Sequence, residues 1–213
     1  MEENMDLKAL EKKAWKTFFD DGLWDIYLGL LLALMGISAL LDKTALSEGQ
    51  SMGVYIGLML IVMAAFFAGK KFITVPRMGH VKFGATRQKK QKNLRLILFL
   101  SFAVGLAAYW LFEGVNSGSI ETDFSLNNIF PLIYAGNMVI VFGLMAYFMD
   151  FERLYFIGLM YALPVPLDRW LYASYGIDLD YLFFALPASL VVIVGIWYLV
   201  RFLKTYPHVQ GNV

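Results

Sequence analysis

Long apolar stretches separated by short polar segments dominate this chain. Five stretches match the length of about 20 apolar residues that a helix needs to cross the hydrocarbon layer of a bilayer. They cover residues 23–41, 52–69, 94–112, 129–149 and 181–200. The pattern therefore predicts an all-α fold, a polytopic bundle of transmembrane helices.

A sixth apolar stretch begins at Leu154, but Pro164 and Pro166 interrupt it and Asp168 and Arg169 follow at once. It is long enough to cross the membrane if it continues through residues 154–175. A chain of six spans and a chain of five spans with one re-entrant segment are both compatible with this pattern.

The composition supports the membrane interpretation. Apolar residues make up 59% of the chain and charged residues 16%, whereas soluble domains have about 45–50% and 25%. An apolar excess of this size has to face lipid, because a soluble core is too small to hold it. The chain has no cysteine, so disulfides, thiolate metal sites and cysteine nucleophiles are excluded.

The distribution of basic residues predicts the orientation of the six-span chain. With both termini in the cytoplasm, all of the 18 Lys and Arg residues except Lys43 and Arg169 fall on the inner side or at its boundary, as the positive-inside rule requires. The predicted organisation is a cytoplasmic segment (1–21), a transmembrane domain (22–203) and a cytoplasmic tail (204–213).

Residues 5–19 carry apolar side chains at the spacing of one helical face. They are interpreted either as an amphipathic helix lying on the inner membrane surface or as a simple lead-in to the first span.

The basic loop 70–93 lies between the second and third spans. Residues 72–75 and 80–83 are β-prone and flank a Pro-Arg-Met-Gly turn, so a small hairpin is expected there. The loop holds eight basic residues and no acidic one. They are interpreted either as ordinary positive-inside patterning or as a binding surface for anionic lipid headgroups; nucleic acid is not expected. The candidate lipid contacts are Lys82, Arg87, Lys89, Lys90 and Lys92.

Two sequence segments carry a resemblance. The segments FFDDGLWDIYLG, at the start of the first span, and ITVPRMGHVKFG, in the basic loop, resemble a group of uncharacterised prokaryotic multi-pass membrane proteins. The resemblance covers the first half of the chain and implies a prokaryotic cytoplasmic membrane, with no assigned activity.

Polar residues at membrane depth are the candidate site. Asp25 lies in the first turn of the first span and has to face protein, water or a cation, whereas Asp20 and Asp21 are expected to cap and solvate the helix start. Other candidates lie in later spans, where an amide needs partners and a broken helix can expose backbone groups. These are Tyr134, Asn137, Pro164, Pro166, Asp168 and Arg169.

No catalytic, metal-binding or cofactor-binding motif is present in the sequence. A small transporter or channel-like protein, assembled as a homo-oligomer, is the leading interpretation. The alternatives are a non-catalytic membrane module that binds a partner protein or anionic lipid, and a membrane enzyme.

Short motifs recur in the order 1–4, 2–5 and 3–6 along the spans. Spans 1 and 4 share Ile-Tyr-x-Gly, spans 2 and 5 share Ile-Gly-Leu-Met, and spans 3 and 6 have Val-Gly before an aromatic pair. The order predicts an inverted repeat, with residues 23–112 related to residues 129–203 by a pseudo-two-fold axis in the membrane plane.

Overall fold

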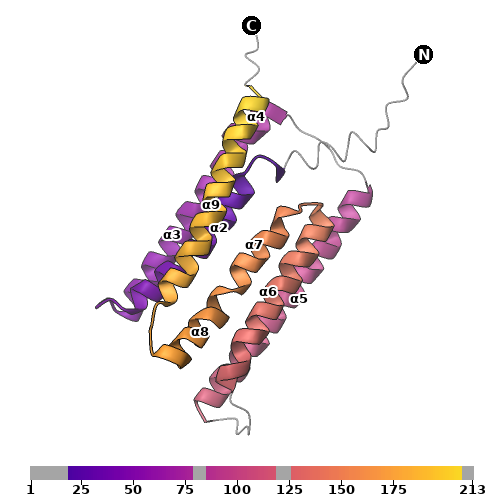
Figure 1. Cartoon of the computed structure of the whole chain (residues 1–213). Coiled ribbons are helices and arrows are strands. Elements are labelled where there is room, and N and C mark those ends of the chain that lie inside the picture. The colour runs from indigo at the N-terminus through magenta and orange to yellow at the C-terminus, as the bar shows by residue number, and fades with distance from the viewer. Residues whose placement is uncertain (1–18, 79–84, 119–125, 208–213) are drawn as a thin grey trace, which may run out of the picture. The chain divides into compact units, whose positions relative to one another are not determined.

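The computed structural model describes residues 19–78, 85–118 and 126–207, and the elements found there are helical (Figure 1). The prediction of an all-α fold is confirmed. In chain order the elements are α2 (Leu23–Asp42), α3 (Glu48–Gly69), the π-helix η1 (Lys70–Thr74), α4 (Val75–Met78), α5 (Ala85–Asn116), α6 (Leu126–Met149), α7 (Arg153–Ala162), α8 (Pro164–Tyr175) and α9 (Asp180–Thr205).

Five of these helical segments are long and apolar enough to cross a membrane, in agreement with the five uninterrupted stretches of the sequence. They are Leu23–Asp42, Glu48–Arg77, Lys92–Val115, Ile129–Met149 and Asp180–Thr205. Helices satisfy their own backbone hydrogen bonds, which is why they can span hydrocarbon at all.

The chain forms two compact units. One contains residues 1–84 and 184–213, and the other contains residues 85–183. The first unit therefore holds α2, α3, η1, α4 and most of α9, and the second holds α5 to α8.

In the first unit, α2 and α3 form an antiparallel hairpin. A capping box starts α3: the Gln50 amide N–H donates to Ser47 Oγ at 3.4 Å, and the Ser47 amide N–H donates to Gln50 Oε1 at 3.1 Å. Both orphan donors at the helix start are thereby satisfied. The hairpin brings the end of α3 beside the start of α2, where Gly69 faces the Leu23 side chain.

Helix α9 packs closely on α2 and runs antiparallel to it. Gly22 abuts the backbone of Gly195, and a methyl group on Gly29 would lie 3.2 Å from the carbonyl oxygen of Ala188. Residue numbers thus rise along α2 while those of its neighbours on α9 fall. The glycines permit this approach because a Cβ atom at either position would meet backbone.

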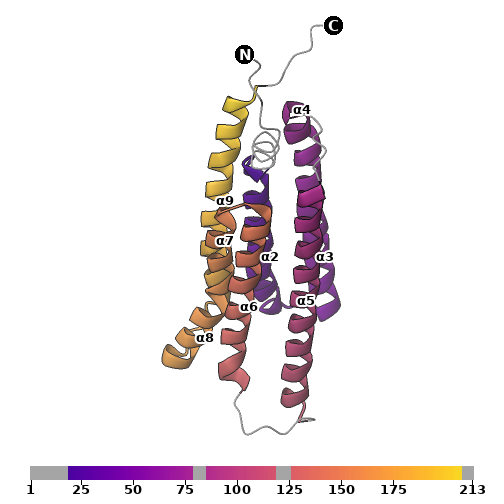
Figure 2. The same ribbon diagram turned by 90° about the vertical axis from the view of Figure 1, so that its right-hand side faces the viewer.

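The second unit is built around α6, which contacts α5, α7 and α8. The rings of Phe142 on α6 and Tyr161 on α7 have centroids 4.8 Å apart, and Gly158 packs directly against Phe142. The sixth apolar stretch is interrupted as expected: α7 ends at Ala162, and Pro164 opens α8, which leaves in a different direction (Figure 2).

The expected strand over residues 72–75 is wrong. The chain continues from α3 through η1 into α4 without leaving a helical path. Local β-propensity is weak compared with tertiary context, and here the side chains of η1 are held against the start of α2, as described below. The partner strand expected over residues 80–83 lies outside the described residues.

Candidate functional site

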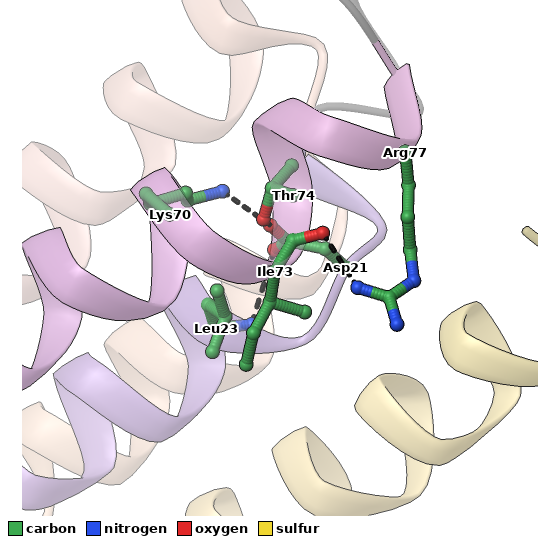
Figure 3. Close-up of polar contacts among 6 residues, drawn as sticks. All are labelled: Asp21, Leu23, Lys70, Ile73, Thr74 and Arg77. Atoms are coloured by element: carbon green, nitrogen blue, oxygen red, sulfur yellow. Dashed lines mark hydrogen bonds and ion pairs between the residues drawn. The ribbon is translucent and has the colours of Figure 1, made fainter. Parts of the chain in front are cut away.

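A buried ion pair joins the start of α2 to the end of α3. Lys70 Nζ lies 2.6 Å from Asp21 Oδ2 (Figure 3). Asp21 is completely buried and Lys70 is 8% exposed. Charged side chains are almost never buried to this degree unless they are paired, so the pair identifies this end of the hairpin as the candidate site.

The Asp21 carboxylate accepts further hydrogen bonds besides the one from the lysine. Thr74 Oγ1 donates to Oδ2 at 2.5 Å, and the Leu23 backbone N–H donates to Oδ1 at 3.1 Å. Thr74 is itself 1% exposed. Three donors therefore converge on this one carboxylate, as a buried polar group requires.

The local backbone explains why these groups converge. Lys70 and Thr74 are the first and last residues of the π-helix, and both side chains reach the same oxygen of Asp21. Gly22 has φ +74°, a left-handed conformation that costs glycine little. This turn lets Asp21 fold back over the first residue of α2. π-Helical turns are rare and are often found at functional sites.

Two aromatic rings flank the lysine. Its Nζ lies 5.8 Å from the centre of the Trp24 ring and 5.9 Å from that of Phe66, within the range of cation–π attraction. We call Asp21, Lys70, Thr74 and the two rings the Lys70 cage. Asp25 is 1% exposed and its Cβ packs against Gly195 of α9.

Arg77 lies one turn beyond the π-helix. Its Nη1 donates to the carbonyl oxygen of Ile73 at 2.9 Å (Figure 3). A cation near the end of a helix can satisfy the last carbonyls and favours the helix dipole. Arg77 therefore helps to end the helical segment that carries Lys70 and Thr74.

The predictions for the acidic residues at the first span had mixed outcomes. Asp21 accepts a hydrogen bond from the Leu23 amide at the start of α2, although the N-cap residue is Gly22. The expectation that Asp21 is solvated is wrong, because packing of η1 removes it from water. Asp25 is buried in the protein, which is one of the three environments expected for it. Asp20 is partly exposed.

The second unit contains the candidates of the later spans. Ser101 Oγ on α5 donates to Asn137 Oδ1 on α6 at 3.3 Å, so Asn137 makes the interhelical hydrogen bond expected of an amide at membrane depth. The hydroxyl oxygen of Tyr134 and Oδ1 of Asp168 are both buried. Pro164, the first residue of α8, is buried. Pro166 and Arg169, further along the same helix, are partly exposed.

The structure describes one side chain of the proposed lipid surface. Lys92 is exposed on α5. Arg87, Lys89 and Lys90 lie in the first turns of α5, but their side chains are outside the described part, as is the whole of Lys82. The amphipathic segment over residues 5–19 falls almost entirely before the first described residue.

A hollow of about 480 Å³ opens at the other end of the α2–α3 hairpin, far from the Lys70 cage along both helices. Its lining mixes acidic, hydroxyl and apolar side chains, namely Ser38, Leu41, Asp42, Leu46, Glu48, Ser51, Met52 and Tyr55. Four of these eight residues are exposed and four are partly exposed.

Lys70 and Thr74 were missed as site residues because both were assigned to the basic loop. A signal for them existed in the sequence. In a hairpin of two antiparallel spans, the residues just before the first span and just after the second lie at about the same level, and Asp21 and Lys70 are two such residues. Opposite charges at those two places predict an ion pair.

Comparison with known proteins assigns no activity. No family model, no curated protein and no solved structure matches this chain. Within the described residues, no group of three His, Cys, Asp or Glu side chains could hold a metal ion. The functional argument therefore rests on the chemistry of the Lys70 cage.

Proposed function

We propose that the protein is a small membrane transporter or channel-like protein whose pathway passes the Lys70 cage. The observation that carries the proposal is the buried Asp21–Lys70 pair at the ends of two apolar helices. Burying two charges costs several kcal/mol per ion, and apolar residues of similar volume often stabilise a protein as well or better. Ionisable residues in membrane-spanning regions typically mark ion or substrate pathways.

Interrupted helices support the same proposal. The π-helix interrupts the segment that carries Lys70, and Pro164 divides the α7–α8 segment. Contacts between α6 and α7 are antiparallel, and α8 also contacts α6. Continuing that register brings Pro164, the first residue of α8, to the level of Tyr134, and Asp168 to the level of Phe130. Transporters commonly build sites where helices break beside ionisable residues.

We also propose that the chain crosses a prokaryotic cytoplasmic membrane six times, with both termini inside. The antiparallel packing of α2 and α9 favours this topology. If α7 and α8 together cross the membrane, α9 is the sixth span and runs opposite to the first. If they were re-entrant, α9 would be the fifth span and would run parallel to α2.

Single introduced thiols test the topology, because the chain has no cysteine of its own. Cysteines placed at Ser47 and Ser117 should react with an impermeant maleimide in intact cells. A cysteine at Gln88 should react only after permeabilisation. Labelling of the Gln88 position in intact cells would reverse the proposed orientation.

The inverted repeat remains part of the proposal. The two compact units do not coincide with its halves, because α9 groups with α2 and α3. Single-particle imaging of the protein in nanodiscs would test it: residues 129–203 should superpose on residues 23–112 after inversion through the membrane plane. Superposition without inversion would remove the repeat.

Flux into proteoliposomes tests the transport proposal. The wild-type protein should carry a cation current on a solid-supported membrane, and Asp21→Asn should reduce that current about tenfold or more, the loss expected when a required charge is removed. Asp42→Asn, an exposed carboxylate at the far end of α2, is the matched control and should leave the current unchanged. A current that Asp21→Asn leaves intact would contradict the proposal.

A second candidate function is an anionic-lipid-binding module. The observation in its favour is that α5 begins at Ala85 and carries Arg87, Lys89 and Lys90 in its first turns. Cations at the start of a helix oppose the helix dipole, so these residues do not serve helix stability.

Vesicle co-flotation of the purified protein tests the second function. Replacing Lys89, Lys90 and Lys92 with Gln should weaken binding to phosphatidylglycerol, at about 1 kcal/mol per charge, and leave insertion unchanged. Unchanged lipid preference would leave positive-inside patterning as the role of these residues.

A further inference from the structure

We infer that the Lys70 cage is a binding site for a small monovalent cation, in which the Lys70 ammonium is a tethered occupant that the cation displaces. This inference rests on the proposed transport function and names its substrate class. The cation is an ammonium-type ion or an alkali-metal ion, both of which share the charge of the lysine head group.

The surroundings of Nζ are those of a cation site. Asp21 Oδ2 lies 2.6 Å from Nζ, and the Thr74 hydroxyl donates a hydrogen bond to the same oxygen. The ring centres of Trp24 and Phe66 lie 5.8 and 5.9 Å from Nζ. Carboxylate and hydroxyl oxygens coordinate hard cations, and aromatic faces attract ammonium groups. All of these groups lie in the first compact unit.

The Lys70 side chain can move out of the cage. A lysine ammonium is a point charge on a flexible four-carbon stem, and Lys70 retains 8% exposure whereas Asp21 retains none. The π-helix places Lys70 at its first residue, where the helix changes its winding. When the ammonium moves out, the Asp21 carboxyl group keeps its hydrogen bonds from Thr74 and Leu23 and its oxygens stay in place for another cation.

The ligand set selects for a monovalent ion. Calcium takes six to eight oxygen ligands and magnesium holds an octahedral shell with several waters. The cage offers one carboxylate, one hydroxyl and two aromatic rings, and no group of three metal-binding side chains occurs in the described part of the chain. A singly charged, weakly hydrated ion fits these ligands better than a divalent one.

Chemical rescue of Lys70→Ala is the test. Trp15, Trp110, Trp170 and Trp197 are first replaced with Phe, so that Trp24 is the single tryptophan and its fluorescence reports on the cage. Methylammonium chloride is then titrated into the detergent-purified protein, with potassium chloride and sodium chloride as separate arms. Lys70→Ala should give a saturable Trp24 response at concentrations about tenfold or more below those needed by the wild type, the size of a typical coupling between two occupants of one site.

Two controls separate the cage from general salt effects. Lys71→Ala removes the neighbouring exposed lysine and should behave like the wild type. Lys70→Ala with Asp21→Asn keeps the empty space but lacks the carboxylate, and should give no saturable response. If Lys70→Ala does not purify, Lys70→Gln removes the same charge and carries the same titration.

The outcomes also separate this inference from the transport proposal. A folded Lys70→Ala protein that shows no saturable response to any of the three cations overturns the cation site. Saturable binding without flux in proteoliposomes would sustain the site and refute transport. Flux that persists without any effect of Lys70 substitutions on cation affinity would refute the site and sustain transport.

Discussion

Removing one charge of the Asp21–Lys70 pair should destabilise the protein far more than removing both. Asp21→Asn leaves the Lys70 ammonium buried without its carboxylate, and Lys70→Met leaves the carboxylate without its ammonium. The double variant contains neither charge, and methionine occupies a volume similar to that of the lysine stem. A double-mutant cycle over these two positions therefore measures the coupling within the pair.

The structure sets the expected magnitudes. Asp21 is completely buried, and breaking a buried pair by removing one partner costs about 3–5 kcal/mol. Lys70→Met should cost toward the lower end of that range, because the Thr74 hydroxyl and the Leu23 amide continue to donate to Asp21. The double variant should lie within about 2 kcal/mol of the wild type, because it leaves no unpaired charge buried and an asparagine oxygen can still accept from the Thr74 hydroxyl and the Leu23 amide.

Reversible unfolding in mixed micelles is a suitable assay. The free energy of unfolding of each variant is measured by titrating sodium dodecyl sulfate into the detergent-purified protein and following helicity by circular dichroism. Asp42→Asn, with an exposed carboxylate, serves as the charge-matched control and should change the unfolding free energy by less than about 0.5 kcal/mol.

The refuting result is additivity. If the loss in the double variant equals the sum of the two single losses within about 0.5 kcal/mol, the two side chains are not coupled. Single losses below about 1 kcal/mol would place the pair among exposed ion pairs, which contribute little. Either result would remove the physical basis of the Lys70 cage.

Two further predictions concern helix packing. Gly29→Ala should destabilise the protein by about 1–3 kcal/mol, the cost of overpacking, because a Cβ there would lie 2.7 Å from Val192 Cγ2. Gly53→Ala is the matched control in the same unfolding assay, because a Cβ at Gly53 meets nothing within 4 Å. Equal effects of the two substitutions would contradict the α2–α9 packing. Asn137→Ala should lower the unfolding free energy by about 0.6 kcal/mol, a typical interhelical hydrogen bond in a membrane, and an equal loss when Ser101 is already alanine would show that the two residues are not bonded.

The positions of the long helices could be read from the sequence alone. The apolar stretch over residues 23–41 became α2, which ends one residue later at Asp42, and the stretch over residues 129–149 lies entirely within α6. The apolar stretches and the helices coincide because backbone polar groups with no access to water have to form hydrogen bonds within their own helix. The break at Pro164 was equally local, because proline lacks the amide that continues a helix.

The basic loop shows where local reading fails. Residues 72–75 are β-prone, yet they form a π-helix and the start of α4 because Lys70 and Thr74 bond to a carboxylate 49 and 53 residues earlier in the chain. Intrinsic preferences of about 1 kcal/mol between residues in strands are smaller than the cost of leaving the Asp21 charge buried without donors.

The sequence by itself thus determined which segments form long apolar helices and where one of them breaks, because those properties depend on hydropathy and on single residues. The tertiary structure decided which charges meet. Asp21 was expected to be in water and Lys70 to belong to the basic loop, but close packing of the α2–α3 hairpin and the left-handed turn at Gly22 bury both together. The charges at the two ends of the hairpin are visible in the sequence, but whether residues 49 positions apart come within bonding distance depends on how the two helices pack.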